Sequence, residues 1–151
     1  MFVLTILLNN KINLMDEAKL TTEQNILAAA EEIFLSKGYA AAKTTEIAKL
    51  AGVNHAMLHY YFRTKESLFN KVFDGKIKLF SNSFFSVFDQ DLPFKEKLKL
   101  AINKHYDFLL ENPRLPMFII GEMLTSEERK AQVKQVLLPR LTIFLLICKR
   151  Q

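Results

Sequence analysis

The chain has 151 residues, of which 50% are hydrophobic and 25% charged, and its formal net charge is +5. This composition argues against a disordered chain and suffices for one packed domain, or for a small domain followed by a larger one. The single cysteine, Cys148, excludes an internal disulfide and a four-cysteine zinc site, and it fits a cytoplasmic protein. Only four glycines and four prolines occur, which favours an all-α fold.

The first residues predict a leader outside the folded domain. Phe2–Leu8 is apolar, but no basic residue precedes it, and Asn9–Lys11 follows where a signal peptide would have small residues. The segment is also far shorter than the ~20 residues that a membrane span needs. We therefore interpret 1–20 as a non-structural leader, with translation starting at Met1 or at the alternative start Met15.

The next segment predicts the first helix of the domain, from about Thr22 to Lys37. Thr21 and Gln24 have the spacing of a capping box, in which each side chain satisfies a free amide of the first turn. At the other end, Lys37 provides a basic last turn, and Gly38 can adopt the positive φ at which helices stop.

Two short helices joined by a tight turn are predicted next. Thr44 or Thr45 can cap the second helix, and Asn54 can cap a third helix over His55–Phe62. Between the two, Gly52 permits the positive φ of a sharp turn. This arrangement is a helix-turn-helix pattern.

The third helix should present a polar face to solvent. Helical spacing places Leu58 and Tyr61 inward, which leaves four residues outward: His55, Ala56, His59 and Tyr60. A helix that carries such groups fits the DNA major groove, where Asn can pair with adenine and His or Tyr can donate to bases or phosphates.

The charge around these helices has the sign expected for a nucleic-acid partner. Between Ser36 and Lys71 there are six Lys or Arg residues and two Glu residues, and six minus two leaves +4. A merely solvated surface is the alternative interpretation.

A long fourth helix should follow, capped by Thr64. Its first residue, Lys65, would lie beside free amides and the positive end of the helix dipole, which together form a natural phosphate site. Apolar residues keep helical spacing for about six turns, to Val87.

Pro139 is expected to end a helix capped by Thr125. The remaining predicted helices cover 93–112, 115–124 and 125–138, and 140–151 begins another.

Few residues in this second half suggest a site. Phe80, Phe84, His105 and Phe108 are candidates for the wall of an apolar ligand cavity, with plain core packing as the alternative. His55 and His59 have metal-binding spacing, but no cysteine or acidic third ligand is evident, so we predict no metal and no cofactor. The chain has no nucleophile-elbow or phosphate-loop motif, and we predict that it is not an enzyme.

The head of the chain resembles the N-terminal domain of TetR-family transcriptional regulators. The resemblance rests on TTEIAKLAGV, 44–53, and LHYYFRTKESL, 58–68, and covers roughly Thr22 to Phe73. It implies a three-helix helix-turn-helix head over 21–68, joined by the fourth helix to a helical ligand-binding and dimerisation domain over 69–151. It also implies a homodimeric repressor that releases a palindromic operator on double-stranded DNA when an unidentified small-molecule effector binds. The positions that match family DNA contacts are Thr45, Asn54, His55, Ala56, His59, Tyr60 and Lys65.

The sequence departs from the family pattern in two places. His59 stands where tyrosine is frequent, and His55 where lysine or arginine is frequent. Family members also continue through two long helices that pair with the partner subunit, so we expect an incomplete second domain or a dimer contact rebuilt from Val133–Ile147. Leu141–Cys148, by its length a buried helix segment and not a membrane anchor, would without a partner be an exposed apolar surface. A helical interaction or decoy protein that cannot form the usual dimer is therefore the alternative function.

Overall fold

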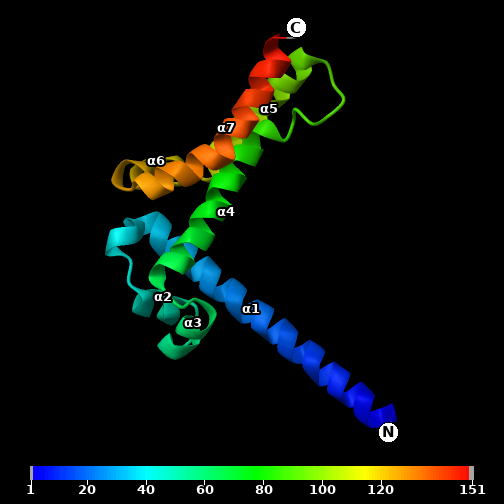
Figure 1. Cartoon of the computed structure of the whole chain (residues 1–151), viewed down its shortest axis with the longest axis vertical. Coiled ribbons are helices and arrows are strands. Elements are labelled where there is room, and N and C mark those ends of the chain that lie inside the picture. Colours follow the sequence, from blue (N-terminus) through cyan, green and yellow to red (C-terminus); the bar gives the residue numbers. More distant parts are fainter. Residues whose placement is uncertain (1, 150–151) are drawn as a thin grey trace. The chain divides into compact units, whose positions relative to one another are not determined.

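The computed structural model describes the backbone of residues 2–149 and the side chains of residues 21–149. Every regular element in this part of the chain is a helix, which confirms the all-α fold class (Figure 1). The chain divides into two compact units, Met1–Phe69 and Asn70–Gln151. The helices are α1 Phe2–Ala41, α2 Thr44–Leu50, α3 His55–Tyr61, α4 Lys65–Phe85, α5 Phe94–Glu111, α6 Leu115–Thr125 and α7 Glu127–Lys149.

Helix α1 is longer than its sequence predicts. It begins at Phe2 and not at Thr22, and no glycine or proline interrupts the chain before Gly38. The backbone is thus helical from Phe2 onward, whereas the side chains of residues 1–20 lie outside the described part, and their assignment to a leader outside the folded domain stays a prediction. Gly38 has a φ of 72° and interrupts the regular helix geometry, at the residue predicted to stop the helix.

The core of the first unit joins α1 to α2, α3 and the start of α4. Phe34 and Phe69 are fully buried and meet edge to face, with ring centroids 4.9 Å apart. Tyr39 contacts Phe69 at 5.0 Å from the other side of the Gly38 bend. The other buried side chains are Ile26, Ala29, Ala30, Ala42, Ile47, Ala48, Leu58, Phe62 and Leu68. This packing holds the two short helices, which at seven residues each are too short to be stable alone.

The second unit packs around aromatic residues of α4 and the turn that follows it. Val87 and Phe88 are buried there together with Ala101 of α5, and Phe144 of α7 contacts Phe88 at a centroid distance of 5.0 Å. Nearer the start of the unit, Phe73 of α4 and Phe118 of α6 meet edge to face at 5.7 Å.

Helix α7 differs from its prediction at both ends. Ser126 caps it and not Thr125, because the Ser126 hydroxyl accepts a hydrogen bond from the Arg129 amide at 3.4 Å while Thr125 donates to the carbonyl of Gly121. The helix also continues through Pro139 instead of ending before it. Proline removes one ladder hydrogen bond, but packing of residues beyond it, such as Phe144, compensates for that loss.

The end of α7 exposes a broad apolar face. Phe144 and Ile147 pack inward, whereas Leu141, Ile143, Leu145 and Leu146 are between 40% and 58% exposed. The expectation that all of Leu141–Cys148 is buried was therefore wrong. The alternative expectation, an exposed apolar surface on this segment, is confirmed. By length and hydropathy alone, α7 is long and apolar enough to cross a membrane. Core helices of soluble proteins meet the same two criteria, so this is weak evidence for a membrane span.

Candidate nucleic-acid interface

The turn between α2 and α3 is a Schellman motif centred on Gly52. The Val53 amide donates to the Ala48 carbonyl at 3.0 Å, and the Gly52 amide donates to the Lys49 carbonyl at 3.2 Å. Gly52 has a φ of 69°, the left-handed conformation that this motif requires and that side chains with a Cβ disfavour. The glycine therefore determines where α2 ends and in which direction α3 begins.

Asn54 begins α3 as its N-cap residue. Its side-chain Oδ1 accepts a hydrogen bond from the Met57 amide at 2.7 Å, which satisfies one free donor of the first turn. Leu58 is fully buried and fastens the helix to the core. The outward residues are exposed as predicted: His55, Ala56, His59 and Tyr60.

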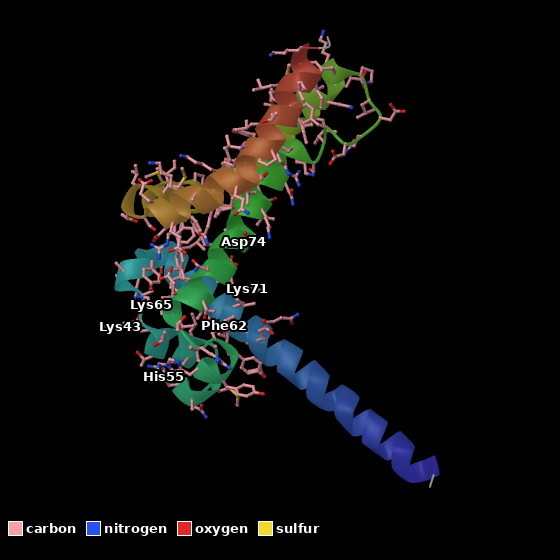
Figure 2. All side chains as sticks on the ribbon, viewed as in Figure 1. Lys43, His55, Phe62, Lys65, Lys71 and Asp74 are labelled. Atoms are coloured by element: carbon pink, nitrogen blue, oxygen red, sulfur yellow. The ribbon has the colours of Figure 1, made fainter. Side chains whose placement is uncertain are left out.

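A row of side-chain contacts crosses the exposed face of α3. Thr44 Oγ1 lies 3.0 Å from His55 Nε2, and His55, which projects from the head in Figure 2, meets His59 edge to face at 4.4 Å. His59 Nδ1 in turn lies 3.2 Å from the carbonyl oxygen of Arg63. The residues from α2 to the start of α4 are thereby connected along the surface where DNA contact is predicted.

The expected cap of α2 is not formed by a threonine. Lys43 is the N-cap residue and makes no side-chain capping bond, because Thr44 lies inside the first turn and its hydroxyl meets His55. Thr45 is exposed, as a DNA contact requires.

The start of α4 has the cap that the sequence predicts. Thr64 Oγ1 accepts from the Ser67 amide at 3.0 Å, and Ser67 Oγ accepts in return from the Thr64 amide at 3.3 Å. Lys65 is partly buried: its ammonium lies 4.4 Å from the ring centroid of Tyr39 and donates to the Ala40 carbonyl at 3.4 Å. The lysine therefore combines a structural contact with the position predicted for phosphate binding.

Part of the positive charge is neutralised within the first unit. Lys37 forms a salt bridge with Glu46 at 2.8 Å, and this hydrogen bond lowers the pKa of the Glu46 carboxyl. Lys49 and Arg63 are exposed and form no salt bridge among the described residues. They remain available as additional contacts to a phosphate backbone.

The four residues predicted for a ligand cavity come together in the second unit. His105 contacts Phe80 at 5.2 Å, Phe84 at 5.9 Å and Phe108 at 6.3 Å between ring centroids, and its Nδ1 lies 2.6 Å from Ser83 Oγ. Burial lowers the pKa of His105. The histidine is therefore held as part of an aromatic cluster, an arrangement typical of core packing.

A surface cavity of about 830 Å³ lies beside this cluster, between α4, α5 and α7. Of the four predicted residues only Phe108 lines it. The remaining lining is largely polar and includes Asn82, Ser86, Asn103, Lys104, Asp107 and Arg140. Its volume is within the range of small-molecule sites. Phe80 and Phe84 instead pack against His105, which fits the alternative of plain core packing, and the role of the four residues in ligand binding stays a prediction.

Sequence reasoning did not anticipate two features. Met57 is 41% exposed on α3, beside the residues of this helix that are predicted to contact DNA. Glu122 and Arg129 form a nearly buried salt bridge of 2.8 Å that joins α6 to α7, and their spacing of seven residues across a helix boundary gives no periodic signal. Among the described residues, no group of three or more His, Cys, Asp or Glu side chains is arranged to hold a metal ion.

The geometry of the head agrees with comparisons to known proteins. The sequence pattern of bacterial regulatory proteins of the tetR family matches residues 26–72, which include α2, α3 and their turn. Residues 26–72 thus carry the N-terminal pattern of the TetR family. The "Fatty acid metabolism regulator protein" of Bacillus subtilis is 29% identical to this chain over 113 residues, 74% of this chain and 58% of that protein. The "HTH-type transcriptional regulator QacR" of Staphylococcus aureus is 42% identical over 50 residues, 33% of this chain and 27% of that protein.

A solved structure shares the fold of this chain beyond the head. The fatty acid degradation regulator FadR from Bacillus halodurans is 28% identical, with a TM-score of 0.61, over 80% of this chain and 62% of that one. The chain spans 58% of the length of the Bacillus subtilis relative.

Proposed function

We propose that this TetR-family chain is a sequence-specific DNA-binding transcriptional regulator, a repressor that an effector releases from a palindromic operator. The observation that carries the proposal is the exposed face of α3, held between the Gly52 turn and the Thr64 cap. Asn54, His55, Ala56, His59 and Tyr60 would meet base edges or phosphates from this helix, and Thr45 and Lys65 would contact the backbone from the neighbouring helices.

The second unit supports the regulatory part of the proposal. The exposed leucines and isoleucines of α7 offer an apolar face that a second copy of the chain would cover in a homodimer. The cavity lined by Lys104 and Arg140 has room for a small-molecule effector. Because two relatives are named as regulators of fatty acid metabolism or degradation, fatty acyl compounds are the first effectors to test. We place the protein in the cytoplasm and assign it no enzymatic activity.

Binding to DNA selected from a random duplex pool tests the proposal. Lys65→Ala should weaken binding to all sequences and reduce the slope of affinity against salt by about one unit, because a phosphate contact is lost. Asn54→Ala should mainly relax sequence preference. Unchanged affinity of both variants in a fluorescence-anisotropy titration would refute the proposed interface.

A helical interaction or decoy protein is the second candidate. The observation that favours it is the exposed apolar face of α7. Through this face the chain, with its intact head, could pair with a longer relative instead of with a second copy of itself. Sedimentation separates the two: a dimer supports the repressor, and a strict monomer supports the second candidate.

A further inference from the structure

The hydrogen bond made by His59 determines which of its ring nitrogens carries a proton. Nδ1 lies 3.2 Å from the Arg63 carbonyl oxygen, and a carbonyl oxygen can only accept. Nδ1 must therefore be the donor. A neutral imidazole has one donor and one acceptor, so Nε2 of the neutral His59 ring is an acceptor.

The ring is also fixed in position on the exposed face. His55 meets it edge to face, with an interplanar angle of 80°, and His55 is held in turn by the hydroxyl of Thr44. His59 is exposed, and no hydrogen bond to its Nε2 is formed among the described residues. The structure therefore presents a preformed acceptor from the face of α3.

We propose that His59 is a specificity-determining residue that accepts a hydrogen bond from the exocyclic amine of cytosine or adenine. In the major groove these amines are the donors, whereas guanine presents the acceptors N7 and O6. A neutral Nε2 has nothing to donate to guanine or to a phosphate. This inference rests on the proposed DNA-binding function and replaces the expectation that His59 acts as a donor.

The tautomer can be tested without DNA. Long-range proton–nitrogen NMR spectra of the isotope-labelled chain at about pH 8, where an ordinary histidine is neutral, distinguish the two nitrogens. The His59 signal is assigned by its loss in His59→Gln. We expect protonation at Nδ1, and a ring protonated at Nε2 would overturn the inference whether or not the chain binds DNA.

Base preference is tested by selecting duplexes with the wild type and with His59→Lys. Lysine only donates, so one operator position should change from cytosine or adenine to guanine, with the original preference falling by about tenfold. Gln24→Lys, on the exposed surface of α1, adds the same charge and should leave the preference unchanged.

The two possible failures are distinguishable. An enriched sequence that is the same for the wild type and His59→Lys would overturn this inference alone. A pool with no enriched sequence for either chain would overturn the proposed function, and the inference with it.

Discussion

Oγ1 of Thr44, in the first turn of α2, lies 3.0 Å from Nε2 of His55, the first residue of α3. This contact ties the two helices of the head together at the surface where DNA contact is proposed. It also accounts for the missing threonine cap of α2, because the hydroxyl cannot serve both purposes in this rotamer.

Replacing this hydroxyl should loosen α3 without unfolding the head. Thr44→Val keeps the shape of the side chain and removes the hydrogen bond, so the free energy of unfolding should fall by about 0.5–1 kcal/mol. Thr45→Val is the matched control, since Thr45 is also β-branched and lies in the same helical turn. Urea titrations of both variants measure the difference, and equal midpoints would show that the Thr44 contact contributes nothing.

Gly52 is expected to be intolerant of even the smallest side chain. A Cβ at Gly52 would meet no atom within 4 Å, so the cost of Gly52→Ala comes from its φ of 69° and should be about 1–2 kcal/mol. Gly75→Ala, inside α4 and equally free of steric contact, should stabilise the chain by up to about 1 kcal/mol. Thermal unfolding compares the two, and shifts in the same direction would contradict this account of the turn.

Asn54 has two roles that different substitutions should separate. Asn54→Ala removes the cap of α3 and should cost about 1 kcal/mol of stability, whereas Asn54→Asp keeps an acceptor for the Met57 amide. Both variants should lose DNA affinity, Asp because its charge repels phosphates. Equal destabilisation by Ala and Asp, measured by urea unfolding, would mean that the cap contributes little.

The buried salt bridge between α6 and α7 should contribute much more to the free energy of unfolding than an exposed one. Glu122→Gln removes the carboxylate charge that lies 2.8 Å from the Arg129 guanidinium in a nearly buried site, so we expect a loss of about 3–5 kcal/mol. The control, Glu127→Gln, breaks the exposed pair with Lys130 and should change stability by less than about 1 kcal/mol. Similar unfolding midpoints for the two variants would be incompatible with a structural role for the buried pair.

His105 should make the stability of the second unit depend on pH. Its folded pKa is lowered by burial, so the unfolded chain binds the proton more readily and protonation favours unfolding. The contribution is complete above the unfolded pKa of about 6.5 and is lost as the pH falls from that value through the lower folded pKa, with a slope below about 1.4 kcal/mol per pH unit. Urea midpoints from neutral to mildly acidic pH should fall less steeply in His105→Gln, and parallel profiles would exclude the histidine as the cause.

The sequence predicted best those parts of the fold that depend on a few neighbouring residues. Gly38, Gly52, Asn54 and Thr64 all occupy the bend or cap positions expected of them, because positive φ and capping are local properties. The outward face of α3 followed in the same way from the spacing of its apolar residues.

Features that depend on tertiary contacts could not be predicted. The neighbouring residues in the sequence made Thr44 a reasonable candidate for the cap of α2. Its hydroxyl instead contacts His55, eleven residues later in the chain. Pro139 normally ends a helix, yet Phe144 and its contacts beyond the proline keep α7 continuous. The proton assignment on His59 likewise depends on the course of the backbone at Arg63, which no residue pattern specifies.

The position of Lys65 over Tyr39 would make the proposed phosphate contact an exchange of partners. In the free chain the ammonium already has an aromatic ring and the Ala40 carbonyl as neighbours, so it reaches a phosphate only by weakening those contacts. A cation–π contact at a partly exposed site contributes about 0.5–1 kcal/mol. Any DNA affinity that Lys65 adds is therefore the free energy of its phosphate contact minus that of its contacts with Tyr39 and Ala40. If the proposed interface is correct, a change at Tyr39, which needs no contact with DNA itself, would alter the affinity of the chain for DNA.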